Sequence, residues 1–128
     1  MKIDHVAIWT KDLERLREFY TKYFNIKSNS RYTNTNRGFE SYFLEFDSGS
    51  RIELMSMPDL VSLKNSAQII VGYAHIAISL GSKDEVNIMT NRLLEDGYTL
   101  VDGPRYTGDG YYESVFLDPD GNYIELVM

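Results

Sequence analysis

Two parts of this sequence repeat the same arrangement of histidine and glutamate. Ile52-Glu53-Leu54 recurs as Ile124-Glu125-Leu126, an interval of 72 positions, and a glycine-containing turn precedes each copy. The only two histidines follow nearly the same interval, because His5-Val6-Ala7-Ile8 recurs as His75-Ile76-Ala77-Ile78 after 70 positions. A repeat of this length indicates one supersecondary unit present twice, and this constrains the fold more than any other feature.

Length, composition and charge exclude several classes of protein. With 128 residues, 43% of them hydrophobic, the chain suits one globular domain with a substantial core. Its formal charge of −6 disfavours nucleic acid and anionic membrane surfaces as partners. The absence of cysteine excludes disulfides and thiolate metal sites. No apolar run is long enough to span a membrane and no signal peptide is present, so we expect a cytoplasmic protein.

The first repeat is predicted to have the order β-α-β-β-β. Asp12 is placed to cap a helix whose apolar residues recur at helical spacing until Asn25. The strands before and after this helix show alternating polarity or are bounded by turn residues. They are expected at residues 3–10, 26–32, 39–46 and 51–57.

The second repeat gives the same order. Ser82 and Glu85 form a capping box before a helix whose apolar face is predicted to include Leu94, and Gly97 ends this helix. A loop rich in glycine is expected at 103–110. The strands are expected at residues 73–80, 98–101 and 111–117 and after Gly121.

These elements predict an α+β fold. Two βαβββ repeats form a cupped mixed sheet with the helices on its outer face. We expect a single domain over 1–128, made of modules at about 1–58 and 73–128. A linker at 59–72, longer than most connections between elements, joins them.

Strand alternation places four candidate metal ligands on one face of the sheet. The apolar neighbours of each candidate should pack against the helices, so His5, Glu53, His75 and Glu125 point to the opposite face. Two imidazoles and two carboxylates suit Zn²⁺, Ni²⁺, Co²⁺, Mn²⁺ or Fe²⁺, and ligand type does not choose among these ions. The same face is expected to hold a pocket lined by Trp9, Phe43, Met55 and Met57.

The sequence resembles the vicinal-oxygen-chelate superfamily, which includes glyoxalases, bleomycin resistance proteins and dioxygenases, and within it the glyoxalase I (lactoylglutathione lyase) branch. The resemblance covers essentially the whole chain. It rests on Asp4-His5-Val6-Ala7-Ile8, Ile52-Glu53-Leu54, Gly72-Tyr73-Ala74-His75-Ile76-Ala77, Phe116-Leu117-Asp118-Pro119-Asp120-Gly121 and Ile124-Glu125-Leu126. It implies one divalent metal per site and a homodimer whose chains share their sites.

The resemblance also implies a reaction. In glyoxalase I a ligand glutamate moves a proton between neighbouring carbons of a thiohemiacetal through an enediolate, so Glu53 and Glu125 are the catalytic candidates. The alternatives are another enzyme of the superfamily (thiol transferase, epimerase or dioxygenase) and a small-molecule binding or resistance protein. Glyoxalase I usually carries an Arg and an Asn that anchor glutathione, and Trp9 and Met57 occupy those positions here. The expected partner is therefore a small-molecule substrate, either a thiol adduct or another carbonyl compound, and the thiol need not be glutathione.

Overall fold

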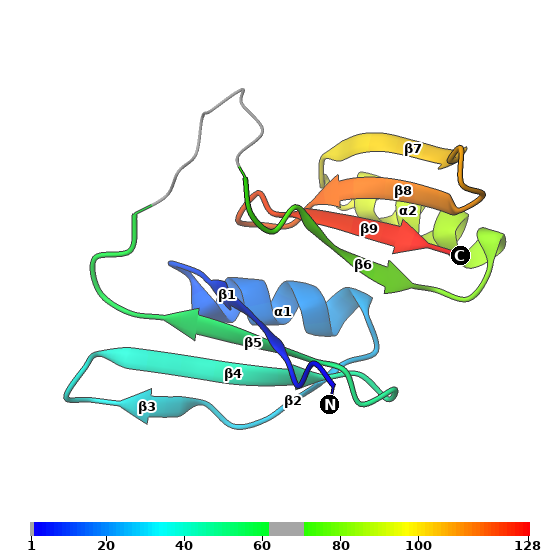
Figure 1. Ribbon diagram of the computed structural model, residues 1–128. Coiled ribbons are helices and arrows are strands. Elements are labelled where there is room, and N and C mark those ends of the chain that lie inside the picture. The colour runs from blue at the N-terminus through cyan, green and yellow to red at the C-terminus, as the bar shows by residue number, and fades with distance from the viewer. Residues whose placement is uncertain (1, 62–70) are drawn as a thin grey trace. The chain divides into compact units, whose positions relative to one another are not determined.

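The structure is a computed structural model that describes residues 2–61 and 71–128 (Figure 1). The chain divides into two compact units, Met1–Leu63 and Lys64–Met128. Both units combine one helix with a mixed sheet, and this confirms the predicted α+β class with two βαβββ repeats. Most of the predicted linker at 59–72 lies outside the described residues.

The first unit is a sheet with its first strand beside its last. The strand order is β1-β5-β4-β2, and β3 also pairs with β4. β1 and β5 are parallel, whereas the other pairs are antiparallel. The elements are β1 (Val6–Trp9), α1 (Leu13–Tyr23), β2 (Lys27–Ser28), β3 (Tyr32–Asn34), β4 (Phe39–Glu45) and β5 (Arg51–Ser56).

The second unit has the same connectivity. Its strand order is β6-β9-β8-β7, and β6 and β9 are the parallel pair. The first strand of each repeat therefore lies beside the last strand of that repeat. The elements are β6 (His75–Ser79), α2 (Lys83–Glu95), β7 (Leu100–Tyr106), β8 (Tyr112–Leu117) and β9 (Tyr123–Val127).

Both helices begin at the predicted caps. The Asp12 carboxylate accepts a hydrogen bond from the backbone N–H of Arg15 at 3.1 Å. The Ser82 hydroxyl accepts one from the N–H of Glu85 at 3.2 Å. Each cap satisfies a backbone donor that the first helical turn leaves without a partner. No helix among the described residues is long and apolar enough to cross a membrane.

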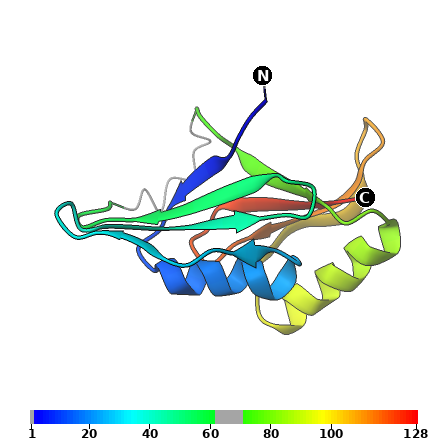
Figure 2. The same ribbon diagram turned by 90° about the horizontal axis from the view of Figure 1, so that it is seen from below.

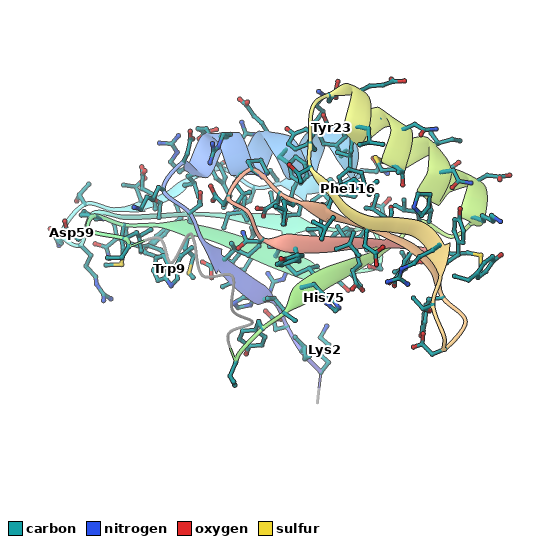
Figure 3. The ribbon with its side chains drawn as sticks, turned by 90° about the horizontal axis from the view of Figure 1, so that it is seen from above. Lys2, Trp9, Tyr23, Asp59, His75 and Phe116 are labelled. Carbon is teal, nitrogen blue, oxygen red and sulfur yellow. The ribbon has the colours of Figure 1, made fainter. Side chains whose placement is uncertain are left out.

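Each helix covers one face of its own sheet, as Figure 2 shows for α1. The residues on either side of each candidate glutamate are fully or almost fully buried, as the alternation predicts. The buried apolar side chains form a layer between the helix and the sheet of each unit, and Figure 3 labels one residue of each layer, Tyr23 of α1 and Phe116 of β8. The layers include Leu16, Tyr20, Leu44, Ile52 and Leu54 in the first unit and Val86, Leu93, Phe116, Ile124 and Leu126 in the second.

Two predictions in the second unit are wrong. Leu94 is 45% exposed, because the buried face of α2 is set by Val86, Thr90 and Leu93, and Leu94 lies about 100° around the helix from Leu93. The loop predicted to begin at residue 103 is strand until Tyr106. β7 is an edge strand with register shifts on both sides of Asp102, and an edge strand tolerates the glycine and proline that suggested a loop.

The first unit differs from the prediction in two segments. β1 begins at Val6 and not at residue 3, and Val6, which was expected to pack against the helix, is 39% exposed. The strand expected at 26–32 is interrupted, and β2 and β3 pair separately with β4. Asn29 lies between them, and its side-chain oxygen accepts a hydrogen bond from the backbone N–H of Phe43 at 2.8 Å. The Asn29 side chain thus occupies a backbone N–H of β4 that would otherwise pair with a neighbouring strand. Asn side chains commonly compete with strand pairing in this way.

A carboxylate on α1 ties the helix to β4. The Tyr42 hydroxyl donates to Glu14 at 2.6 Å, Arg17 pairs with it at 2.9 Å, and Arg31 also contacts it. The hydrogen bond from Tyr42, followed by those from the two arginines, lowers the pKa of Glu14 from 4.5 to about 2. Because this pKa is depressed in the folded state, the stabilisation is present above pH 4.5 and is lost as the pH falls toward 2.

We expect Glu14→Gln to lower the free energy of unfolding at pH 7 by about 1 kcal/mol, the typical value of one such hydrogen bond. The deficit should shrink below about pH 4.5, because the unfolded chain then takes up a proton at this carboxyl before the folded protein does. Urea unfolding at pH 7 and pH 3 measures both effects. Glu18→Gln, on the exposed side of the same helix, is the matched control. Equal stability of the Glu14 and Glu18 variants at pH 7 would contradict this account.

Candidate metal centre

Parallel strand pairing brings His5 beside Glu53 in the first unit. In the register of β1 and β5, Ala7 is the partner of Glu53. His5 precedes Ala7 by two residues and therefore projects from the same face of the sheet. Its Nε2 lies 3.6 Å from Oε2 of Glu53.

The second unit builds the same pair at the same register. Ala77 is the partner of Glu125 across β6 and β9, and His75 precedes it by two residues. The Nε2 of His75 lies 3.2 Å from Oε2 of Glu125. In Figure 3, His75 lies on the side of its sheet away from α2. The structure thus brings each histidine together with the glutamate of its own repeat.

The two glutamates are the less exposed members of these pairs. The side chains of Glu53 and Glu125 are 15% and 19% exposed, whereas both histidines are more than one-third exposed. Within residues 2–61 and 71–128, no three His, Cys, Asp or Glu side chains form a group that would hold a metal ion. Each described unit therefore supplies two candidate ligands, and a common site for all four stays a prediction.

The ring of His5 is held by a carboxylate on its other nitrogen. Nδ1 lies 2.9 Å from Oδ2 of Asp4, and Arg51 also contacts this carboxylate. Hydrogen bonds from His5 and then Arg51 hold the pKa of Asp4 below its usual value. An ionised carboxylate only accepts, so Nδ1 donates to Asp4, and Nε2 is the ring nitrogen that faces Glu53. Ala74 stands at the matching position before His75, so the second pair lacks this partner.

Three of the four predicted pocket residues line one hollow. Trp9 and Met55 are partners across β1 and β5, and Met57 follows β5. These three line a hollow of about 400 Å³ together with residues of β3, β4 and the turn between them. Phe43 does not belong to this hollow. It pairs with Glu53 across β4 and β5, and its ring packs edge-on against the His5 ring with centroids 5.1 Å apart.

Sequence reasoning missed a second carboxylate on the candidate face of the second unit. Val115 is the partner of Glu125, so Glu113, two residues earlier on β8, projects from the same face. Glu113 is only 8% exposed and lies 3.6 Å from the Arg105 guanidinium. Burial first, and then the neighbouring charge of Glu125, raise its pKa above the usual value. The alternation along 111–117 gives the face of Glu113, but only the register of β8 and β9 places it near Glu125.

The family model of the Glyoxalase/Bleomycin resistance protein/Dioxygenase superfamily matches residues 2–126. The chain belongs to this superfamily. Comparison with curated proteins gives no match. Members of the superfamily bind small-molecule substrates, commonly hold a divalent metal ion and often form dimers.

Solved structures of superfamily members show the same fold at low sequence identity. A glyoxalase family protein from Enterococcus faecalis is 21% identical, with a TM-score of 0.80 over 99% of this chain and 97% of that one. The trypanothione-dependent glyoxalase I of Leishmania major is 24% identical, with a TM-score of 0.79 over 99% and 86%. FosX, a fosfomycin resistance protein from Listeria monocytogenes, is 22% identical, with a TM-score of 0.73 over 98% and 89%.

The donor atoms in each unit of this superfamily member fit a divalent ion. Two ligand atoms that lie 2.0–2.2 Å from one ion are at most about 4.4 Å apart, and the separations of 3.6 Å and 3.2 Å meet this limit. In each pair, a ring nitrogen faces a carboxylate oxygen across this separation. A cation between them satisfies both, and nitrogen with oxygen donors is typical of the borderline divalent metals.

We expect Glu113→Gln to raise the stability of the metal-free protein at pH 7. The folded pKa of Glu113 is raised, so the folded state binds its proton more tightly, and stability falls as the pH rises from 4.5 through the raised pKa. The stability of the Gln variant should not decrease over this pH range. Urea unfolding of both proteins from pH 4 to pH 8 tests the difference. Glu18→Gln, which alters an exposed residue of α1 in the other unit, is the control for removal of one negative charge. A lower stability of Glu113→Gln at pH 7 would mean that the pairing with Arg105 outweighs burial.

Proposed function

We propose that this protein is a metal-dependent lyase or isomerase of the glyoxalase type. Its substrate is a thiohemiacetal or a related small molecule with neighbouring oxygen atoms. The observation that supports this most is the equivalent His–Glu pair in both units, at the same register of the same parallel strand pair. A structural histidine has no need for a glutamate at the same place in both repeats.

The proposed metal ligands are His5, Glu53, His75 and Glu125. When bound, a divalent ion supplies Lewis-acid polarisation of the substrate oxygens. A carboxylate oxygen of Glu125 or Glu53 takes the proton from the carbon that carries both sulfur and hydroxyl. The same carboxylate returns this proton to the neighbouring carbonyl carbon while the hydroxyl proton passes to the former carbonyl oxygen, so an α-hydroxy thioester leaves without net oxidation. Asp4 keeps the His5 ring in one tautomer, with Nε2 available.

The proposed assembly is a homodimer with shared sites. His5 and Glu53 of one chain complete a site with His75 and Glu125 of its partner, and the dimer holds two such sites. Superfamily members often form dimers. Each unit of this chain carries one matched half of the ligand set, which is what a two-fold arrangement of two chains requires.

Metal uptake and turnover together test the proposal. The protein is purified without chelators and its metal content measured, then it is stripped and reloaded with each of Zn²⁺, Ni²⁺, Co²⁺, Mn²⁺ and Fe²⁺. We expect about one ion per chain, and isomerisation of methylglyoxal thiohemiacetals only in the reloaded protein. A folded protein that takes up none of these ions would refute the metal centre. Metal uptake without turnover of any thiohemiacetal would refute the lyase and favour a binding or resistance protein.

The residues near Glu53 predict weak use of glutathione. Glutathione is recognised through its charged ends, and each charge-assisted hydrogen bond contributes about 1.5–3 kcal/mol. Trp9 and Met57 make one wall of the hollow apolar, and Arg37 is the single cation among its described lining residues. We therefore expect turnover of the methylglyoxal–glutathione adduct to be far below that of a dedicated glyoxalase I.

Adding polar anchors should improve this turnover. We expect Trp9→Arg combined with Met57→Asn to raise kcat/KM at least about tenfold, mainly through KM, because the new contacts are remote from the proton transfer. Trp9→Phe combined with Met57→Leu keeps the wall apolar and is the matched control. A wild-type kcat/KM above about 10⁵ M⁻¹s⁻¹ would show that glutathione is held by other residues.

A further inference from the structure

The hollow beside Glu53 has an aromatic and apolar lining. Trp9 packs edge-on against Phe39 with ring centroids 6.1 Å apart, and the Tyr32 ring also packs against Phe39, with centroids 6.2 Å apart. Met55 and Met57 complete this lining. The volume of about 400 Å³ lies in the range of small-molecule sites. Methionine and aromatic side chains provide a surface that adapts to a flat apolar group.

The hollow continues from the candidate metal ligand along the same face of the sheet. Met55 follows Glu53 by two residues on β5, and Trp9 follows Ala7, the partner of Glu53, by two residues on β1. Two residues of a strand span about 6.6 Å. A small molecule with one end at Glu53 therefore reaches Trp9 and Met55, which lie side by side on the same face.

Arg37 is the cation of this hollow, and its charge is not neutralised. It lies in the turn between β3 and β4, where its backbone N–H donates to the carbonyl of Asn34 at 3.2 Å. Among the described residues, no carboxylate forms an ion pair with its guanidinium, which is exposed. The other arginines of this unit pair with carboxylates: Arg15 with Asp12, Arg17 with Glu14, Arg31 with Glu14 and Glu40, and Arg51 with Asp4. In a chain with a formal charge of −6, a free guanidinium is a local site for an anion.

We infer that this hollow binds the non-reacting end of the substrate, a flat apolar or aromatic group that ends in a carboxylate. The ring lies against Trp9 and Phe39, and the carboxylate pairs with Arg37. This inference rests on the proposed function only in taking the other end of the molecule to react at Glu53. It names a substrate class that carries its own acid group, in place of the charged ends of glutathione.

The single tryptophan of the chain makes this binding measurable without turnover. Trp9 is the only tryptophan, so its emission reports on the hollow alone. The probe is 3-phenylpropionate, titrated into metal-free protein. The controls are 3-phenylpropanamide, which keeps the ring without the charge, and propionate, which keeps the charge without the ring. We expect a saturable change with 3-phenylpropionate and at least about tenfold weaker binding of both controls.

A substitution separates the role of Arg37 from general charge effects. We expect Arg37→Gln to weaken binding of 3-phenylpropionate at least about tenfold and to leave binding of the amide unchanged. Arg92→Gln, on α2 in the other unit, removes the same charge and should have no effect. Thermal unfolding checks that both variants are folded. Equal affinity of Arg37→Gln and the wild type would overturn the inference.

A second measurement covers the case in which Trp9 emission does not respond. Methyl resonances of Met55 and Met57 in ¹³C-methionine-labelled protein should shift with the same saturation. A probe that moves neither the Trp9 emission nor these resonances would overturn the inference. The titration uses metal-free protein and no thiol, so its result is independent of the lyase. Probe binding by a protein that takes up no metal would support the binding hollow and refute the lyase. Metal-dependent turnover by a protein that binds no probe would support the lyase and refute the binding hollow.

Discussion

Replacing His75 with alanine should remove most of the bound metal and lower kcat/KM at least about a thousandfold, while the protein stays folded. Loss of residues that only support metal ligands typically costs 10–100-fold in affinity or activity, and loss of a ligand removes a direct bond. The metal itself accounts for several kcal/mol of transition-state stabilisation, and about 4 kcal/mol corresponds to a thousandfold in rate.

The fold should tolerate this change because the His75 side chain lies outside the apolar layer. It is more than one-third exposed and lies on the face away from α2. Ser79→Ala, which alters an exposed residue on the same face of β6, is the matched control. Metal content, thermal unfolding and kcat/KM are measured for both variants. A His75→Ala protein that keeps one ion per chain and the wild-type rate would refute the proposed ligand set.

Mixing two inactive variants should restore activity if the sites are shared between chains. His5→Ala and Glu125→Ala each damage both sites of their own homodimer. In a mixed dimer, one site carries both substitutions and the other carries none. Random exchange makes about half of the dimers mixed, so an equal mixture should recover about a quarter of the wild-type activity.

The chain offers a control for this experiment. His5→Ala and Glu53→Ala lie in the same unit, so each site of their mixed dimer carries one damaged half and no activity should return. Recovery in the first mixture and not in the second is the expected result. Solution mass must show a dimer, since a mass near the 14.8 kDa of one chain would contradict sharing. Mixed dimers without recovered activity would mean that each chain holds its own site.

The elements of this fold were predictable where the signal is local and repeated. The 72-residue interval between Glu53 and Glu125 predicts two βαβββ units, because equal spacing of equivalent residues requires equivalent structure. The caps Asp12 and Ser82 act within three residues of themselves, so the sequence alone determines them. Strand alternation likewise gives the face of each candidate ligand, since successive side chains point to opposite sides.

What the sequence by itself determined is therefore the repeat, the class of fold and the face on which each histidine and glutamate lies. Only the tertiary structure decided which of them are neighbours, through the parallel pairing of β1 with β5 and of β6 with β9. The placement of Glu113 near Glu125 and of Arg37 beside Trp9 has the same origin. Alternation fixes the direction of a side chain along one strand, but the two parallel pairs join segments far apart in the chain, and no connecting turn sets their register.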